Sequence, residues 1–210
     1  AASDVYKRQT WVNADLQPLG ATLGESTEVG IKKSFNNERA VLTLAYFSSE
    51  QSNFGNFVGR NELNIAIYEG ITLESRGYEI EFSGELFDGL NIGAGFTDVS
   101  VEDQFGTEIR NFIPKKLLKL SASYAVPAVE GLKVGGIVKW QDDVTTEDKL
   151  VGQDAFTLLD LAVHYQLNEK LSFSVNLENV TDEKYFRSLY WDQAYYGAPR
   201  NVSASVRWKY

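Results

Sequence analysis

The 210-residue sequence predicts an all-β protein, namely an antiparallel up-and-down transmembrane β-barrel with about nine strands. Three observations support this fold class. Apolar and polar residues alternate in segment after segment, which gives each segment the two chemically different faces of a β-strand. The connections between these segments alternate between short turns and long polar loops, as in a meander of hairpins. No part of the sequence approaches the roughly 18 consecutive apolar residues of a transmembrane helix.

Most expected strands have the roughly 9–11 residues, or more, that a tilted strand needs to cross a bilayer. In chain order they lie near residues 25–34, 40–49, 64–87, 89–102, 113–126, 131–142, 154–167, 169–180 and 199–210. The third is the longest and is expected to project past the membrane. Short turns are expected at residues 35–39, 87–90, 127–131 and 167–170, and long loops at residues 48–60, 102–111, 142–154 and 181–198. Short turns therefore mark one rim of the barrel and long loops the other.

The last expected strand shows the alternation most regularly. One face carries Val202, Ala204, Val206, Trp208 and Tyr210, and the other carries Ser203, Ser205, Arg207 and Lys209. A soluble sheet would turn the apolar face into a core, whereas an outer-membrane barrel turns it to lipid and gathers aromatic residues at the interfaces. Trp208 and Tyr210 end the last strand, Tyr165 is near a short turn and Trp140 is near a long loop. These positions are typical of an aromatic girdle and favour the membrane barrel.

The expected strand number is odd, whereas bacterial single-chain outer-membrane barrels have an even number of strands. The sequence also begins without methionine. We therefore expect an incomplete barrel that lacks its N-terminal part. Residues 1–9, AASDVYKRQ, resemble a translated sequencing-adapter scar and are expected to be a non-native or disordered end. Residues 10–210 are expected to form one architecture.

Composition disfavours several classes of function. The net charge of −9 and the pI near 4.7 argue against nucleic-acid binding, because phosphate contacts need a basic face. Without cysteine and with the single histidine His164, the sequence predicts no metal site, no cofactor and no Ser/His/Asp triad. The pairs Glu102/Asp103 and Asp142/Asp143 lie in expected loops. We interpret them as solvated charges rather than as calcium ligands or an acid–base pair.

Four segments carry a family resemblance. STEVGIKKSFNNERAVLTLAYFSSEQSN (26–53) contains an E-x-G-x-K strand followed by an L-x-L-A-Y-F strand, and ESRGYEIEFSGELFDGLNIGAGFT (74–97) begins with S-R-G-x-E-x-E. NLENVTDEKYF (176–186) has the pattern N-L-x-N-x-x-D-x-x-Y, and YYGAPRNVSASVRWKY at the end has Y-G-x-P-R. In this order they resemble the C-terminal part of TonB-dependent outer-membrane receptors of the ferric-siderophore branch. Tyr210 stands where these receptors more often end in phenylalanine.

The resemblance implies the C-terminal portion of a larger plugged barrel in the outer membrane of a Gram-negative bacterium. The intact receptor would import a ferric-siderophore with energy from TonB, and it would not be an enzyme. The implied partners are the siderophore complex, outer-membrane lipid, TonB and the barrel-assembly machinery. That machinery would read the alternating apolar residues of the last strand, which end at Tyr210. A small self-contained porin or adhesin barrel is the alternative, and a membrane hydrolase lacks a nucleophile motif near His164.

The loop EKYFRSLYWDQAYYG holds the expected ligand surface. Its members are aromatic residues grouped around one cation: Tyr185, Phe186, Arg187, Tyr190, Trp191, Tyr195 and Tyr196. Such a group suits an anionic, partly apolar ferric chelate through stacking and charge pairing. For any one of the aromatic residues, a place in the interface girdle or in loop packing is the alternative. Five neighbouring residues are expected to shape the chain instead, namely Asn179, Asp182, Gly197, Pro199 and Arg200.

Overall fold

The computed structural model describes residues 11–190 and 193–210. All named elements of this part of the chain are β-strands, which confirms the all-β prediction. None of the described residues forms a helix that could span a bilayer. The expectation for residues 1–9 and the predicted ligand residue Trp191 lie outside the described residues.

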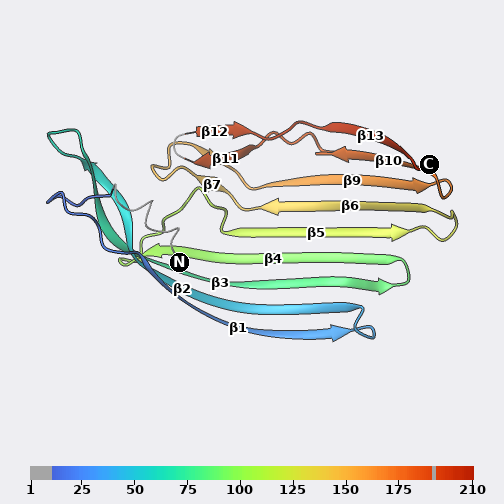
Figure 1. Cartoon of the computed structure of the whole chain (residues 1–210), viewed down its shortest axis with the longest axis horizontal. Coiled ribbons are helices and arrows are strands. Elements are labelled where there is room, and N and C mark those ends of the chain that lie inside the picture. Colours follow the sequence, from blue (N-terminus) through green and yellow to red (C-terminus); the bar gives the residue numbers. More distant parts are fainter. Residues whose placement is uncertain (1–10, 191–192) are drawn as a thin grey trace. The chain divides into compact units, whose positions relative to one another are not determined.

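Nine strands form one sheet in which each strand lies beside its neighbours along the chain (Figure 1). They are β1 (Leu23–Phe35), β2 (Ala40–Arg60), β3 (Ala66–Phe87), β4 (Leu90–Asp103), β5 (Lys116–Ala125), β6 (Leu132–Gln141), β9 (Phe156–Gln166), β10 (Leu171–Glu178) and β13 (Asn201–Trp208). All pairs from β4 to β13 are antiparallel. The nine predicted strands and the four predicted short turns are therefore confirmed. β1 and β13 are the outermost strands in this order.

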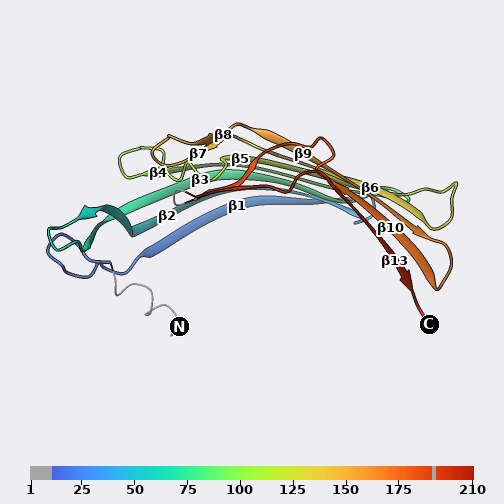
Figure 2. The ribbon, with the colours of Figure 1, turned by 90° about the horizontal axis from the view of Figure 1, so that it is seen from above.

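The register places residues of like polarity opposite one another. Phe173 of β10 lies opposite Tyr165 of β9 and Val206 of β13, whereas the next residue, Ser174, lies opposite Ser205. Because successive side chains point to opposite sides, these strands share one apolar face and one polar face. Figure 2 shows β6, β9, β10 and β13 in a single layer. The two-faced strands predicted from the alternation therefore pair in a register that gives the sheet one apolar face and one polar face.

One predicted loop is wrong. Residues 48–60 belong to β2, which is 21 residues long and continues to Arg60. Strand pairing needs only backbone hydrogen bonds, so a polar segment can extend a sheet when its neighbour is also extended. Here Ser49 and Ser75 approach each other across the two strands, with their hydroxyl oxygens 2.8 Å apart. β3 has 22 residues and is the long third strand that the sequence predicts.

Two predicted loops contain short hairpins. β7 (Val144–Thr145) pairs with β8 (Gly152–Gln153), and β11 (Phe186–Tyr190) pairs with β12 (Gln193–Tyr196). Neither hairpin is predicted from the sequence, because each strand is too short for an alternation to be recognised.

The described residues form two compact units. The first comprises residues up to Val29 together with Tyr46–Gly77 and Ser100–Ile109. The second comprises Gly30–Ala45, Tyr78–Val99 and Arg110–Tyr210. The second unit contains both short hairpins.

Aromatic packing dominates the first unit. The ring of Trp11 stacks on Tyr68 at a centroid distance of 5.4 Å and meets Phe54 edge-on at 6.1 Å. Gly55 is buried beneath Trp11, and a Cβ atom there would lie 2.3 Å from the indole ring. The amide of Tyr68 donates to the carbonyl oxygen of Val12 at 2.8 Å, which adds a short parallel bridge beside β3. The segment around Trp11 therefore covers backbone and aromatic groups of the β2–β3 hairpin.

At the short-turn rim of the second unit, two neighbouring turns are joined by polar contacts. Asn36, Asn37 and Glu38 all have positive φ angles, between 52° and 66°, a conformation that asparagine tolerates better than most residues. The Arg39 guanidinium lies 2.9 Å from Asp88 and 3.2 Å from Glu85. These ion pairs connect the β1–β2 turn with the β3–β4 turn.

Candidate functional site

The loop between β10 and β13 begins and ends at one buried side chain. Asn179 is 4% exposed and its side-chain amide donates to the carbonyl oxygens of Glu183 at 2.9 Å and Ala198 at 3.1 Å. Its side-chain oxygen accepts from the Glu183 amide at 2.9 Å. Its own amide donates to the carboxylate of Asp160 on β9 at 2.9 Å. Asn179 therefore holds both ends of the loop against the sheet.

Two hydrogen bonds of Arg200 also stabilise the base of this loop. The amide of Arg200 donates to the Asp182 carboxylate at 3.0 Å, and the Arg200 guanidinium donates to the carbonyl oxygen of Val180 at 3.3 Å. These bonds confirm that Asn179, Asp182 and Arg200 shape the chain, as the sequence predicts.

Gly197 is where the returning chain crosses Tyr185. A Cβ atom on Gly197 would lie 2.0 Å from the Tyr185 ring, and the Gly197 amide donates to the Tyr185 carbonyl oxygen at 2.8 Å. On another side, the Tyr185 ring meets the buried Phe156 of β9 at a centroid distance of 4.6 Å. Tyr185 therefore packs at the base of the β11–β12 hairpin.

The hairpin itself contains a β-bulge. Phe186 lies opposite Tyr196 and Ser188 lies opposite Tyr195, so β11 has one extra residue, Arg187. The rings of Phe186 and Tyr196 are 4.8 Å apart. Bulges bend a strand and change the direction of the side chain at the extra residue. The only described cation in the predicted ligand set is thus at an irregular position of the strand, and its side chain is exposed.

Three tyrosines of the hairpin face water. Tyr190 is 44% exposed, Tyr195 is 58% exposed and Tyr196 is 74% exposed. The hydroxyl of Tyr195 donates to the side-chain oxygen of Gln193 at 2.6 Å. Leu189, which directly precedes Tyr190 on β11, is only 3% exposed and anchors the hairpin. The predicted set therefore divides into the half-buried Tyr185 and Phe186 and an exposed group of three tyrosines and Arg187, with Trp191 outside the described residues.

Two neighbouring loops hold the hairpin in place. The Phe112 ring packs on Tyr190 at a centroid distance of 4.8 Å, and the Arg110 guanidinium lies 5.8 Å from the centre of the Phe112 ring. The side-chain oxygen of Gln153 on β8 accepts a hydrogen bond from the Phe186 amide at 2.8 Å. Phe112 and Gln153 are not predicted from the sequence, because nothing in a polar loop indicates which distant loop it contacts.

These two loops also contact each other. Glu147 accepts hydrogen bonds from the Arg110 amide at 2.9 Å and from the Asn111 side chain at 3.3 Å. The amide of Thr145 donates to the Asn111 carbonyl oxygen at 2.9 Å. β7, β11 and β12 accordingly lie at the same end of the second unit (Figure 1). Three loops that are far apart in sequence form one polar and aromatic cluster.

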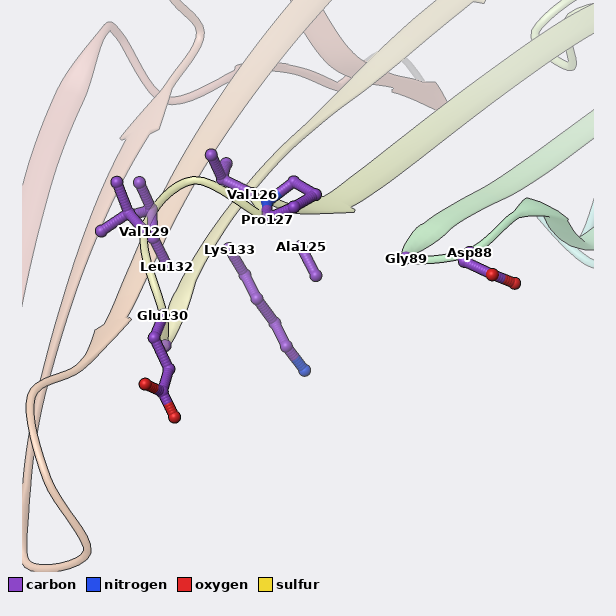
Figure 3. A pocket seen from close by; sticks show the side chains of 10 residues that line it. Asp88, Gly89, Ala125, Val126, Pro127, Val129, Glu130, Leu132 and Lys133 are labelled. Atoms are coloured by element: carbon purple, nitrogen blue, oxygen red, sulfur yellow. The ribbon is translucent and has the colours of Figure 1, made fainter.

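Two open pockets occur elsewhere in the second unit. One, of about 520 Å³, lies between Asp88 and Gly89 of the β3–β4 turn and Val126, Pro127 and Val129 of the β5–β6 turn (Figure 3). It is at the short-turn end of the sheet, opposite the hairpin (Figure 1). Neither its lining nor its position matches the predicted ligand surface.

The other pocket, of about 650 Å³, lies on the polar face of the sheet. Its lining includes Lys139, whose ammonium is 2.7 Å from the Asp160 carboxylate. Also on this face, Nδ1 of His164 is 2.9 Å from the Ser174 hydroxyl, so the single histidine is hydrogen-bonded within the sheet. Among the described residues no group of three or more His, Cys, Asp or Glu side chains could hold a metal ion.

Comparison with known proteins gives a consistent result. Residues 4–180 match the family model "TonB dependent receptor-like, beta-barrel". The chain is 34% identical over 203 residues to the ferripyoverdine receptor of Pseudomonas aeruginosa PAO1, covering 89% of this chain and 25% of that protein. It is 25% identical over 202 residues to the ferrioxamine B receptor of Salmonella typhimurium, covering 89% of this chain and 28% of that protein.

A solved structure agrees with these relatives. The pyoverdine outer membrane receptor FpvA from Pseudomonas aeruginosa PAO1, bound to pyoverdine, superimposes with a TM-score of 0.86 at 31% identity. The match covers 96% of this chain and 32% of that chain. The chain spans about a quarter of the length of the curated relatives it matches.

Proposed function

Because this chain belongs to the TonB dependent receptor-like β-barrel family, we propose that it is the C-terminal barrel part of an outer-membrane receptor for ferric-siderophores. In this proposal residues 10–210 belong to the barrel, residues 1–9 have no function, and uptake through the intact receptor uses energy from TonB. The names of the relatives support a ferric-siderophore ligand, since they are receptors for ferripyoverdine and ferrioxamine B. They also favour a receptor over a porin, an adhesin or an enzyme.

The observation that carries the ligand site is the exposed group on the β11–β12 hairpin. Tyr190, Tyr195 and Tyr196 present aromatic surface to water although Leu189 and the neighbouring loops hold the hairpin in place. Tyrosine offers a large contact area and a hydroxyl group at a low entropic cost, which is why it is frequent in binding surfaces. These residues suit stacking on the organic part of a ferric chelate.

Arg187 would supply the charge. A guanidinium pairs with anionic oxygens through fixed, often bidentate hydrogen bonds and also stacks on aromatic rings. Its exposed position at the bulge of β11, directly after Phe186, which lies opposite Tyr196, suits both kinds of contact. In the same proposal Tyr185, Phe186 and Trp191 complete the ligand set, with Tyr185 and Phe186 supporting it from the base.

The apolar face of the last strand is proposed to face outer-membrane lipid and to carry the signal for the barrel-assembly machinery. Val202, Val206, Trp208 and Tyr210 are all exposed, and Ala204 lies on the same face. In water such a continuous apolar surface would be unfavourable, whereas in an outer-membrane barrel it is the surface that contacts lipid.

The proposal is tested with the full-length receptor that contains this chain, produced in outer membranes. Saturable binding of ferripyoverdine and ferrioxamine B, each loaded with radioactive iron, is measured at equilibrium, and uptake is measured with and without TonB. We expect binding of at least one of the two complexes and TonB-dependent uptake. The triple change Tyr190→Ala, Tyr195→Ala and Tyr196→Ala is expected to weaken binding about tenfold or more, since aromatic anchors dominate binding surfaces.

Two further variants complete the test, namely Arg187→Gln and a control substitution at the opposite rim of the sheet. Removing the charge is expected to weaken binding about threefold to tenfold, as for a charge-assisted hydrogen bond. Tyr165→Ala alters an aromatic residue next to the β9–β10 turn, at the other rim, and should leave affinity unchanged. Absence of saturable binding of both complexes to a correctly assembled receptor would contradict the proposed function.

A further inference from the structure

The exposed hairpin depends on two side chains that do not belong to it. Phe112 packs against the Tyr190 ring, and Gln153 accepts the hydrogen bond of the Phe186 amide. The two contacts are at opposite ends of β11, so together they restrain the whole strand. Each comes from a different loop.

The Phe112 contact supports an aromatic ring that is itself partly exposed. Tyr190 ends β11 and lies opposite Gln193, beside the tip of the hairpin. Packing on Phe112 at a centroid distance of 4.8 Å limits the motion of this ring. Phe112 is in turn covered by the Arg110 guanidinium at 5.8 Å.

The Gln153 contact acts at the bulge. The Phe186 amide immediately precedes the extra residue Arg187, where the β11–β12 ladder is interrupted. A bulge leaves its extra residue outside the regular ladder, so a side-chain acceptor beside it stabilises one geometry. Gln153 is itself paired with Val144, and β7 is bonded to Asn111, in the loop that carries Phe112.

We propose that Phe112 and Gln153 are positioning residues that set the affinity of the receptor for its ferric chelate without touching it. This inference rests on the proposed function of the hairpin. A binding surface that is ordered before the ligand arrives does not lose further conformational entropy on binding, so its affinity is higher than that of a mobile one. The three connected loops therefore form one preorganised unit. Within it, Phe112 and Gln153 make the contacts between the hairpin and the other two loops.

The test compares variants of the full-length receptor in outer membranes. Phe112→Leu keeps an apolar side chain but removes the ring, and Phe112→Tyr keeps the ring. Gln153→Leu removes the acceptor, and Gln153→Glu keeps an acceptor. Phe105→Leu is the matched control, because Phe105 is on the same connection between β4 and β5 and is 80% exposed. Equilibrium binding of ferripyoverdine and ferrioxamine B gives both the dissociation constant and the number of sites.

The two quantities separate positioning from folding. A variant that assembles less well has fewer sites, whereas a variant with a loosened hairpin has the same number of sites with a weaker dissociation constant. We expect Phe112→Leu and Gln153→Leu each to weaken the dissociation constant about twofold to tenfold at an unchanged number of sites. Phe112→Tyr and Gln153→Glu should restore most of the affinity, and Phe105→Leu should match the unmodified receptor.

Other outcomes overturn the inference in distinguishable ways. If the unmodified receptor binds and both leucine variants keep its dissociation constant, the positioning role is wrong while the proposed function stands. The same conclusion follows if the leucine variants only reduce the number of sites, or if Phe105→Leu weakens binding equally. If the assembled, unmodified receptor binds neither complex, the proposed function fails and the inference fails with it.

Discussion

The β2–β3 hairpin and the β11–β12 hairpin use aromatic side chains in opposite ways. In the first, Trp11 covers Gly55 and stacks on Tyr68, so the rings mostly contact one another. In the second, Tyr195 and Tyr196 face water, and the hairpin is held by side chains of other loops. A cluster of aromatic residues in the sequence therefore does not identify a binding surface. What distinguishes the two is whether the rings are covered by other side chains, as by Trp11, or face water, as Tyr195 and Tyr196 do.

The largest effect is expected at the base of the β11–β12 loop. Asn179→Ala removes the partners of two carbonyl oxygens and one amide, at Glu183 and Ala198. We expect a local destabilisation of about 2–3 kcal/mol, because three part-buried hydrogen bonds that join the two ends of the loop would be lost. Hydrogen exchange should show lost protection in β11 and β12 and unchanged protection in β5 and β6. Exchange that rises equally in all four strands would mean that Asn179 supports the whole sheet rather than this loop.

The corresponding change in the other hairpin is Trp11→Ala. It removes one stacked and one edge-on ring contact from a half-buried side chain, which we expect to destabilise the β2–β3 hairpin by about 2 kcal/mol. Exchange of the Tyr68 amide, which is bonded to Val12, is the direct measurement. If the Trp11 cluster is purely structural, the affinity for the ferric chelate does not change. A weakened affinity would show that this hairpin also contributes to the ligand site.

A smaller effect is expected at the crossing of Gly197 and Tyr185. Gly197→Ala places a methyl group against the Tyr185 ring, so the ring must move, at a cost of about 1–2 kcal/mol. Gly95→Ala is the matched control, because a Cβ atom there meets no heavy atom within 4 Å. We expect Gly197→Ala to lower the melting temperature and ligand affinity relative to Gly95→Ala. Equal behaviour of the two variants would mean that the hairpin base tolerates displacement of Tyr185.

The smallest effect is a pH dependence in the β7–β8 turn. The Thr146 hydroxyl and then the Leu150 amide donate to the Asp148 carboxylate at 2.5 and 3.0 Å, and these bonds lower the pKa of Asp148. A lowered pKa in the folded state stabilises the turn fully above the unfolded pKa of about 4, and this stabilisation is lost as pH falls through the folded pKa. Hydrogen exchange of Leu150, corrected for its intrinsic pH dependence, should therefore increase at acidic pH. In Asp148→Asn this increase should disappear.

Residues of the same site differ in how far the sequence predicts them. Arg187 and the exposed tyrosines lie close together in sequence, so their grouping is visible without a structure. Phe112 and Gln153 are distant from them along the chain, and each is a single ordinary residue in a polar loop. Their roles depend on where the β4–β5 and β6–β9 connections fold, which no local pattern encodes. The loop prediction for residues 48–60 is wrong for a related reason, since the pairing that makes them a strand comes from β3.

Sequence patterns alone predict the nine strands of the large sheet and their faces, apart from the extension of β2 through residues 48–60. Alternation sets which side chains share a face, and the turn residues near Asn36, Gly89 and Gly131 set where the chain reverses, because both are properties of neighbouring residues. Which aromatic residues are packed and which are exposed depends on the tertiary structure. It brought Phe112 to Tyr190, Gln153 to Phe186 and Asn179 to Asp160. These contacts form between distant segments, so they depend on the arrangement of the whole sheet.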